Sequence, residues 1–574
     1  MKNFKISIVL LISVVTNLNM TKMKSVRLLV FIFLIPSYSY CQKNIEWITH
    51  FGSSTPYYGI EQGRYIITDP EGNIYVAGEF AETILIDGKI LISNGGKDIF
   101  LAKLNPLGKV LWLKNIGGTN GDWCGGICLD ENSNIFLTGT FRGKITIDKS
   151  VFNSISWYDI FLTKINKDGQ IIWSKAFIGD GGNSTNAITK DINGYLYLTG
   201  YYSQELYFDN VQLYGPTARS DLFVVKLNAD GKVIWAKSTK GNANNYGNSI
   251  TSDNNGHLYL TGFMWDSVYF DSHLLVSTNS LGLLQVYVTK INASTGEFLW
   301  AIGGGGSGWS EGTSVEVDNN GDVVLGGWYR NDLYFGNDFL TNGGNDNGPD
   351  DIFIAKFDSN GSLKWLITTR CNLYSTCNDL TINTDNDIFL TGLFRGNILI
   401  GDTLYYSTVP SYHDIYVLKL DKNGIIKWFK SFGGDSPMND IGFGITNLDS
   451  NIFITGFYSS NSWFDDKLLN CNGASDVFVV KLSNTDESIP DDEIGDINVF
   501  PNPCSGTLFI DLNNNLSSFQ IRLLDLTGRE LFFKTTINEP FSTVNLSNHS
   551  AGIYFLTIHD LINNTSITKI IIKE

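Results

Sequence analysis

Several residue types that define large classes of protein are scarce in this sequence. Of 574 residues only 12 are proline, 5 methionine and 6 histidine, and charged residues make up 17%. Lys and Arg number 41 against 58 Asp and Glu, so the net charge is −17 and the basic excess that nucleic-acid binding requires is missing. No segment after residue 41 has the roughly 18 consecutive apolar residues of a membrane helix. We therefore expect neither a nucleic-acid partner nor a transmembrane segment once an N-terminal signal is removed.

Motifs of known chemistry are also missing. The histidines are scattered, and neither HExxH nor GxSxG occurs. The glycine-rich stretch Gly303–Trp309 lacks the Lys-Ser/Thr pair of a phosphate-binding loop, and we expect no cofactor. Calcium is the one open possibility, because a short segment after residue 344 holds the carboxylates of Asp346, Asp350 and Asp351.

Cysteine is limited to seven residues, one of them in the export segment. Cys371 and Cys377 flank a short polar loop and are predicted to form a disulfide, which an exported protein can keep. Cys124 and Cys128 lie too far apart along a strand to pair unless the chain bends. Zinc is disfavoured, because the spacings do not form a CxxC pair and no histidine is near.

The N-terminus has the pattern of an export signal. Lys24 and Arg27 precede the apolar run Leu28–Ile35, which ends at Pro36. We predict that residues 1–41 are an export segment and that translation starts at Met20 or Met23. The alternative is one uncleaved anchor, although polar residues interrupt the apolar runs. A lipoprotein is disfavoured, because the position before Cys41 holds a tyrosine rather than a small residue.

Two motifs recur seven times between residues 44 and 482, and both advance by 61 to 66 residues. The first motif starts with Asp, or Gln in its fourth copy, and has a lysine five residues later; the second is typified by "GNIYVAGEF". The first begins at Asp98, Asp159, Asp221, Gln285, Asp351, Asp414 and Asp476, with Lys103, Lys164, Lys226, Lys290, Lys356, Lys419 and Lys481 after them. The second begins at Gly72, Ser133, Gly194, Gly256, Gly321, Asn386 and Ser450.

Each repeat reads as four antiparallel strands. The segments are short, rich in Ile, Val, Phe and Tyr, and bounded by Asp, Asn and Gly. "DIFLAKL" is apolar on both faces, which indicates a strand buried on both faces. Such units stacked face to face predict an all-β fold, a seven-bladed β-propeller over residues 44–482. The repeats exceed known propeller repeats in length, and the excess in each reads as an added short hairpin.

A tryptophan strand ends each repeat except the last. The tryptophans are Trp112, Trp173, Trp235, Trp300, Trp365 and Trp428, and a seventh, Trp47, follows the export segment directly. We predict that the N-terminal strand with Trp47 closes the last blade, because closure removes the exposed strand edges of an open array. We interpret the tryptophans as residues that pack between blades, and the Asp and Lys of the first motif as serving strand ends and blade interfaces.

The composition and the strand pattern of the sequence change after residue 482. Residues 483–496 are polar and acidic and are predicted to be a linker. Residues 497–574 show alternating strands with turn signals, which predicts a small Ig-like β-sandwich.

This tail resembles the type A C-terminal sorting domain of the type IX secretion system of Bacteroidetes. The matching residues are Pro501, Asn502, Pro503, Gly506, Gly528, Gly552, Tyr554, Lys569 and Lys573. The resemblance implies that the secretion machinery is a partner and that the protein reaches the outer surface or the medium through the periplasm. The repeats in turn resemble the SBBP-type propeller repeats of bacterial secreted proteins.

These patterns favour a function in non-catalytic binding, adhesion or display, with an unknown glycan or protein as ligand. The alternative is a secreted propeller enzyme, a hydrolase or lyase acting on polysaccharide. The central channel distinguishes the two, because an enzyme should hold carboxylates or a histidine with a perturbed pKa there.

Overall fold

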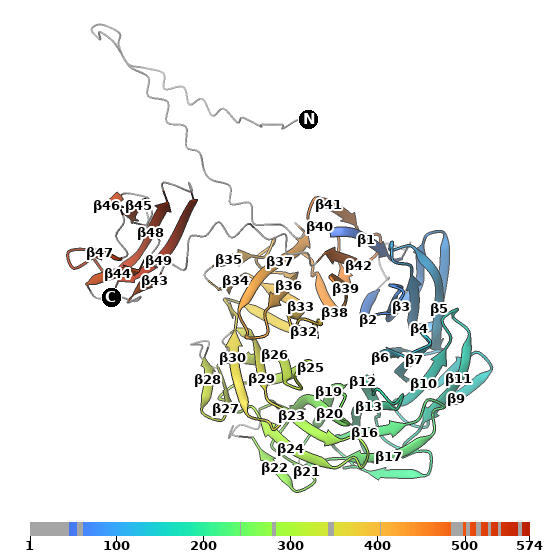
Figure 1. The fold of residues 1–574 in the computed structure, drawn as a ribbon. Helices are drawn as coiled ribbons and strands as arrows, with labels where there is room; N and C mark the ends of the chain where they lie inside the picture. Colours follow the sequence, from blue (N-terminus) through green and yellow to red (C-terminus); the bar gives the residue numbers. More distant parts are fainter. Residues whose placement is uncertain are drawn as a thin grey trace, which may run out of the picture. The chain divides into compact units, whose positions relative to one another are not determined.

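The computed structural model describes residues 45–53, 61–241, 243–277, 283–341, 349–401, 403–434 and 436–483 of the repeat region. In the C-terminal part it describes residues 498–500, 506–511, 518–525, 530–537, 541–560 and 565–573. Every regular element within these ranges is a β-strand (Figure 1). The predicted export segment and nearly all of the predicted linker lie outside the described residues.

The repeat region contains seven units of four antiparallel strands. The chain runs through the strands of a unit in their spatial order, so neighbours in sequence are neighbours in the sheet. The strands of the first four units are β2 (Gln62–Thr68), β3 (Ile74–Ile86), β4 (Lys89–Leu104) and β5 (Val110–Gly118); β6 (Asp122–Leu129), β7 (Ile135–Phe141), β10 (Asp159–Ile165) and β11 (Ile171–Phe177); β12 (Ser184–Lys190), β13 (Leu196–Tyr202), β16 (Asp221–Leu227) and β17 (Val233–Ser238); β19 (Asn245–Ser252), β20 (His257–Met264), β23 (Gln285–Asn292) and β24 (Phe298–Gly303).

The remaining three units follow the same plan, and the seventh takes its fourth strand from the N-terminus. Their strands are β25 (Ser310–Val317), β26 (Val323–Arg330), β29 (Asp350–Phe357) and β30 (Leu363–Thr368); β32 (Tyr374–Ile382), β33 (Ile388–Arg395), β36 (His413–Leu420) and β37 (Ile426–Gly434); β38 (Ile441–Leu448), β39 (Asn451–Tyr458), β42 (Asp476–Ser483) and β1 (Ile45–Phe51). All residues of β7 and β29 are buried, as predicted for strands covered on both faces.

The first strands of successive units contact one another in a closed series. They follow the order β2, β6, β12, β19, β25, β32 and β38, and β38 in turn contacts β2. The units are arranged around this series, and their later strands lie farther from the centre (Figure 1). The apolar clusters combine strands of neighbouring units, so each core lies between two sheets.

The N-terminal strand β1 pairs antiparallel with β42, from Ile45 opposite Leu482 to Phe51 opposite Val477. This is the pairing predicted from the missing seventh tryptophan strand. Lys481 also forms an ion pair with Glu46 at 2.8 Å. The outer edge of β42 is therefore covered by the other end of the same region.

The carboxyl group of Glu61 is buried near β42, the strand that pairs with β1. Glu61 is 0% exposed, and the backbone N–H of Ser53 offsets only part of the cost of burying its carboxylate. Burial, reinforced by the nearby carboxylate of Asp476, raises the pKa of Glu61 to about 9. Two equivalent residues, Asp122 and Asp440, are also buried carboxyl groups, but both accept hydrogen bonds from backbone N–H groups. The other equivalents are uncharged, namely Asn183, Asn245, Ser310 and Ser375.

We expect Glu61→Gln to stabilise the protein at alkaline pH. A raised folded-state pKa means that the folded state binds the extra proton between about pH 4.5 and 9, so wild-type stability falls as pH rises through this window. The variant should lose this dependence, which amounts to about 1.4 kcal/mol for each pH unit. Denaturant unfolding of both proteins from pH 5 to 9 measures it. Parallel stability curves for the two proteins would show that Glu61 does not titrate in this window.

The tryptophan of each unit except the sixth packs on the hairpin turn of the next unit. Cβ atoms built on the turn glycines Gly108, Gly169 and Gly231, all at positive φ, would lie 2.6 to 3.2 Å from the rings of Trp47, Trp112 and Trp173. Only glycine therefore fits these turns. The indole N–H of Trp112 donates to the carbonyl of Lys167 in the next unit.

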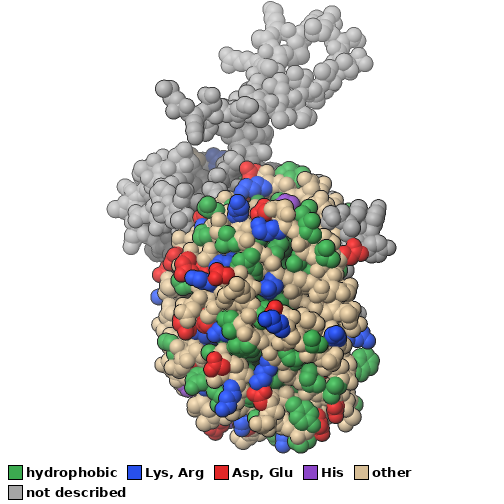
Figure 2. All heavy atoms as spheres, turned by 90° about the vertical axis from the view of Figure 1, so that its right-hand side faces the viewer, with side chains coloured by type: hydrophobic (Ala, Val, Ile, Leu, Met, Phe, Trp, Pro, Cys, Tyr) green, Lys and Arg blue, Asp and Glu red, His purple; other side chains and the backbone are tan. Residues whose placement is uncertain are grey.

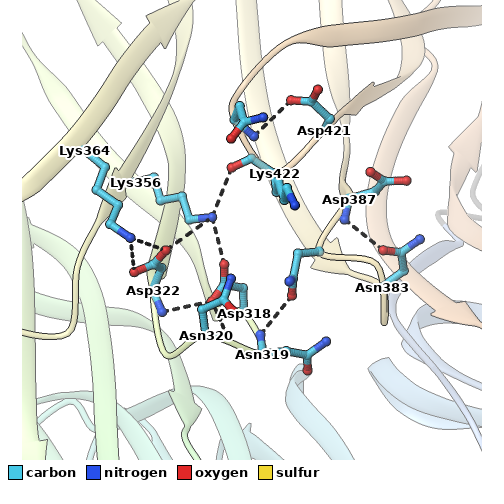
Figure 3. A network of polar contacts seen from close by, with 12 residues as sticks. Asp318, Asn319, Asn320, Asp322, Lys356, Lys364, Asn383, Asp387, Asp421 and Lys422 are labelled. Carbon is cyan, nitrogen blue, oxygen red and sulfur yellow. Dashed lines mark hydrogen bonds and ion pairs between the residues drawn. The ribbon is translucent and has the colours of Figure 1, made fainter.

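The motif lysines serve the same interface, as interpreted from the sequence. Lys103 donates to the carbonyl of Lys167 at 3.2 Å, next to the Trp112 indole. In the fifth unit Lys356 donates to the carbonyl of Lys422 at 3.1 Å and pairs with Asp318 at 2.8 Å (Figure 3). The turn carbonyl and the acidic turn residue together compensate the buried ammonium group.

The extra length of each repeat forms a short hairpin that joins the preceding unit. In the first unit the hairpin extends β3 and β4; the others are β8 (Lys144–Ile147) and β9 (Ser150–Asn153), β14 (Glu205–Phe208) and β15 (Val211–Tyr214), β21 (Ser267–Phe270) and β22 (His273–Val276), β27 (Asp332–Phe335) and β28 (Asp338–Thr341), β34 (Asn397–Ile400) and β35 (Thr403–Tyr406), and β40 (Asn461–Phe464) and β41 (Lys467–Asn470). β8 pairs with β5 and β40 pairs with β37, while the short strands β18 (Lys240–Gly241) and β31 (Arg370–Cys371) pair with β21 and β34. These hairpins thus link neighbouring units.

The C-terminal part, taken by itself, consists of two sheets that share one core. The first contains β43 (Asn498–Phe500), β44 (Thr507–Asp511) and β47 (Phe541–Asn545), and the second β46 (Glu530–Ile537), β45 (Ser518–Leu524), β48 (Gly552–Asp560) and β49 (Thr565–Lys573). Leu508 and Val544 from the first sheet pack in the same cluster as Ile521, Leu556 and Ile571 from the second.

Candidate ligand-binding site

All seven first strands carry a β-bulge at the same register. A bulge leaves one residue without a cross-strand partner and turns its side chain. The unpaired residues are Arg64, Gly125, Asn186, Asn248, Thr313, Asn378 and Phe443. Because the first strands form a closed series, these seven positions surround the centre of the repeat region.

Most of these side chains bond to the next unit in the series. The Nδ2 of Asn186 donates to the carbonyl of Gly247 at 3.0 Å, and that of Asn378 donates to Gly442 at 2.7 Å. Asn248 and Thr313 make the corresponding bonds at 3.0 and 2.7 Å. The Arg64 guanidinium lies over the Phe443 ring, 4.1 Å from its centroid. Gly125 has no side chain, so the series is interrupted in the second unit.

A cavity of about 410 Å³ is lined by residues of all seven first strands. It holds two carboxyl groups with perturbed pKa values, those of Glu316 and Asp379. Burial and the proximity of Asp379 raise the pKa of Glu316 to about 7, and burial raises that of Asp379 to about 6. Asp379 accepts bonds from Ser314 Oγ and the Ile445 N–H, and Glu316 accepts one from Thr251 Oγ1.

A second cavity of about 380 Å³ opens among the first three units, where the bulge series is interrupted. Four of its lining residues are aromatic, namely Tyr65, Trp123, Tyr158 and Tyr201. The rings of Trp123 and Tyr158 meet edge to face with centroids 5.1 Å apart. Tyr201 stacks on Tyr246 at 4.0 Å, and burial raises the pKa of Tyr201, so its hydroxyl stays protonated. We call this cavity the mouth pocket.

The mouth pocket also contains an ion pair. The Nε of Arg64 lies 3.1 Å from Oε2 of Glu79, and the backbone N–H of Cys124 donates to Oε1 at 3.2 Å. The Glu79 side chain is 2% exposed and that of Arg64 is 35% exposed. A second guanidinium nitrogen donates to Gln62. Glu79 therefore holds Arg64 in place and neutralises its charge, while part of the Arg64 side chain remains accessible.

Comparing the seven units position by position separates structural residues from the rest. The residue before Glu79 is glycine in every unit, and a Cβ on Gly78 would lie 1.9 Å from the carbonyl oxygen of Gln62. This glycine is required because the second strand closely approaches the bulge of the first. The residue after it varies and is Glu79, Thr140, Tyr201, Phe263, Trp328, Leu393 or Phe457. Its cross-strand partner also varies and is Gln62, Trp123, Ser184, Tyr246, Glu311, Thr376 or Ile441.

The metal and disulfide predictions fall on sites with other contacts. Asp346 lies outside the described residues. Asp350 pairs with Arg330 at 2.6 Å, and Asp351 accepts the N–H of Cys371 at 2.7 Å. Within the described ranges no group of three or more metal-ligating side chains occurs.

The predicted disulfide was wrong, because Cys371 and Cys377 are both free. Cys371 is on β31, where its Sγ contacts the carbonyls of Tyr374 and Arg395. Cys377 is on β32, and its Sγ faces Gly326 of the neighbouring unit. The short segment between them thus spans two sheets, which point the two thiols at different neighbours.

Part of the predicted sorting motif is described. Pro501, Asn502, Pro503 and Gly528 lie outside the described residues. Gly506 precedes β44, Gly552 begins β48, and Lys569 and Lys573 lie on β49. Tyr554 is buried, and its hydroxyl donates to the carbonyl of Ser550 at 2.6 Å, which ties the strand to the preceding turn.

Two surface properties bear on partners. On the side of the molecule in Figure 2, acidic and basic side chains are interspersed with apolar ones, so the net negative charge is not gathered there into one patch. Over the residues that the structure describes, no helix has the length and apolarity to cross a membrane.

Comparison with known proteins gives weak similarity for the repeats and a family match for the tail. An uncharacterized WD repeat-containing protein of Acanthamoeba polyphaga mimivirus is 22% identical over 500 residues, 72% of this chain. The match spans only 31% of that relative's length. Among solved structures, the extracellular domain of a hybrid two-component system of B. thetaiotaomicron is 12% identical with a TM-score of 0.23 and covers 88% of this chain and 80% of its own. PorZ, a surface component of the type IX secretion system of Porphyromonas gingivalis, is 10% identical with a TM-score of 0.20 and covers 91% and 100%.

Residues 498–573 match the family described as the secretion system C-terminal sorting domain. The range coincides with the two-sheet C-terminal part. The tail is thus the sorting domain of type IX secretion, and the protein is exported to the cell surface or into the medium.

Proposed function

We propose that residues 44–482 form a seven-bladed β-propeller of SBBP-type repeats, closed by the N-terminal strand. The seven four-stranded units, the closed series of first strands and the pairing of β1 with β42 support this architecture. The similarity to a WD repeat-containing protein is consistent with it. Residues 1–41 act as the export signal to the periplasm, and residues 483–496 link the propeller to an Ig-like sorting sandwich.

The propeller binds a glycan or protein ligand at the cell surface without catalysis. One observation carries this proposal: residues of the first three units at two facing positions that vary between repeats line the mouth pocket, although the glycine beside one of these positions is the same in all seven units. The residues that recur in every repeat hold the blades together, so the fold does not require the particular residues found at the variable positions. A concave pocket with aromatic walls and one held cation is a typical ligand site.

A polysaccharide hydrolase or lyase is the second candidate. It is favoured by Glu316 and Asp379, which place two carboxyl groups with raised pKa values in the central cavity. Such groups can act as general acid and base near neutral pH. The hydrogen bonds of Asp379 to two neighbouring units give it a structural role as well.

Blocking the mouth pocket should abolish binding. Ser184→Trp places a large ring in the pocket, at a position where the second unit carries Trp123. Ile441→Trp is the matched control, because Ile441 has the equivalent place in the seventh unit and does not line the pocket. Wild type and control should bind at least one member of a panel of immobilised oligosaccharides and purified surface proteins, and the blocked variant should lose binding at least tenfold.

The same samples distinguish binding from catalysis. Each bound glycan is recovered and its chain length compared with the input. Unchanged glycans support a binding protein. Shortened or unsaturated products that disappear in Asp379→Asn would favour the enzyme, and equal binding by all three proteins would place the ligand elsewhere.

A further inference from the structure

We infer that the mouth pocket takes a neutral saccharide, with one sugar ring against Trp123 and its hydroxyls on Arg64. This inference rests on the proposed binding function and specifies its ligand. The pocket lies beside Gly125, the one bulge position without a side chain.

The bulge at Gly125 has no side chain to bridge to the following unit. In the third, fourth and sixth units the equivalent position carries asparagine, whose amide bonds across to the following unit. A Cβ on Gly125 would lie 2.5 Å from the carbonyl oxygen of Thr185, so the backbones of the second and third units approach too closely for any side chain. The second unit therefore lacks the side-chain bond to the following unit that the third to sixth units make. Cys124, next to Gly125, lines the pocket.

The aromatic walls fit the apolar face of a sugar ring. The hydrogens on that face carry small positive charges and are attracted to the negative face of an aromatic ring. Tyr158 meets Trp123 edge to face and so fixes the orientation of the indole. In the unit that precedes them the position of Trp123 is Gln62, and in the unit that follows it is Ser184, so the indole is a local feature rather than part of the repeat.

The Arg64–Glu79 pair favours a neutral ligand over an anion. Glu79 is buried and lies 3.1 Å from the Nε of Arg64, so the pair carries no net charge and attracts an anion weakly. The guanidinium stacks on Phe443 and bonds to Gln62, and its remaining N–H groups can donate to sugar hydroxyls. In the other units none of the residues equivalent to Glu79 is charged, so this buried carboxylate is not a demand of the fold.

Arg64 contacts the ligand, and Glu79 acts as a positioning residue through Arg64. The hydroxyl of Tyr65 donates to the carbonyl of Asn186 at 3.1 Å, and both residues line the pocket. The chain thus provides one stacking surface and one donor group in the lining of the same cavity.

The test is calorimetric titration of the full-length protein with neutral oligosaccharides built from glucose, mannose, galactose or xylose. Uronic acid oligomers of equal length are titrated in parallel. We expect at least one neutral series to bind at least tenfold more tightly than its acidic counterpart. Trp123→Ser, which copies the residue of the third unit, and Arg64→Gln should each weaken that binding about tenfold or more. Trp328→Leu, which copies the sixth unit at a position outside the pocket, should change it less than twofold.

Melting curves of all variants show whether each one is folded. If Trp123→Ser unfolds, Arg64→Gln still tests the inference, because the Arg64 side chain is partly exposed. Neutral binding that both variants retain would overturn the pocket assignment but not the proposed binding function. Binding only to uronic acids, or to no saccharide, would overturn the neutral-saccharide inference. If no saccharide binds, a purified surface protein that binds the wild type but not the Ser184→Trp variant would still support the proposed function.

Discussion

Removal of β1 is expected to unfold the repeat region or to make it associate. Deleting residues 45–51 removes the ladder to β42, at about 1 kcal/mol for each lost hydrogen bond. It also removes Trp47, whose indole N–H donates to Pro106 and whose ring lies on Gly108. Truncation of this half-buried ring alone should cost about 3 kcal/mol. The sum is comparable to the whole stability of a typical domain, about 5–15 kcal/mol.

Denaturant unfolding and light scattering of the purified protein measure the effect. Trp47→Ala should reproduce part of the loss without exposing the edge of β42. Leu107→Ala provides the control, because this neighbouring side chain is 80% exposed. A deletion protein that unfolds like the parent and stays monomeric would mean that β1 does not hold the two ends of the region together.

Loss of the C-terminal part is expected to abolish export across the outer membrane while leaving the repeat region folded. The core of the two C-terminal sheets is a separate cluster from those of the repeats. A chain ending at Ser483 should therefore keep the unfolding profile of the repeat region and remain in the periplasm. Residues 484–574 fused behind a signal-bearing reporter should carry the reporter to the surface or the medium.

Cell fractionation with a periplasmic marker distinguishes the outcomes. The reporter fused to a tail that lacks β49, residues 565–573, is the control, because this strand supplies Ile571 to the core. Surface delivery of the chain ending at Ser483, or periplasmic retention of the complete fusion, would contradict the role of the tail.

Most of the strands could be predicted because the same sequence pattern occurs in seven repeats. The turn glycines, the tryptophans and the Asp–Lys motif recur for a physical reason, namely the contact between one unit and the next. The pairing of β1 with β42 followed from counting the tryptophan strands. The sorting tail was recognisable because its motifs occur in a fixed order along the chain.

The candidate site could not be predicted in the same way. Glu79, Trp123 and Tyr158 belong to two different units, and only the closed series of first strands brings them to one pocket. A usable signal was present, because each of the three departs from the residues at the same place in most other units. The predicted pairing of Cys371 and Cys377 failed because sequence distance does not reveal that β31 and β32 lie in different sheets.

The position of β42 has a mechanical consequence for export. This strand lies between β39 and β1, and its last residue, Ser483, leads directly into the segment that carries the sorting domain. A pulling force applied to the tail is therefore transmitted to a strand that is hydrogen-bonded on both sides. A force along this strand loads both ladders in shear, so that their bonds must break together, whereas a strand peeled from an edge releases them one at a time. By pairing with β42, the N-terminal strand β1 thus strengthens the attachment of the strand that leads to the sorting domain.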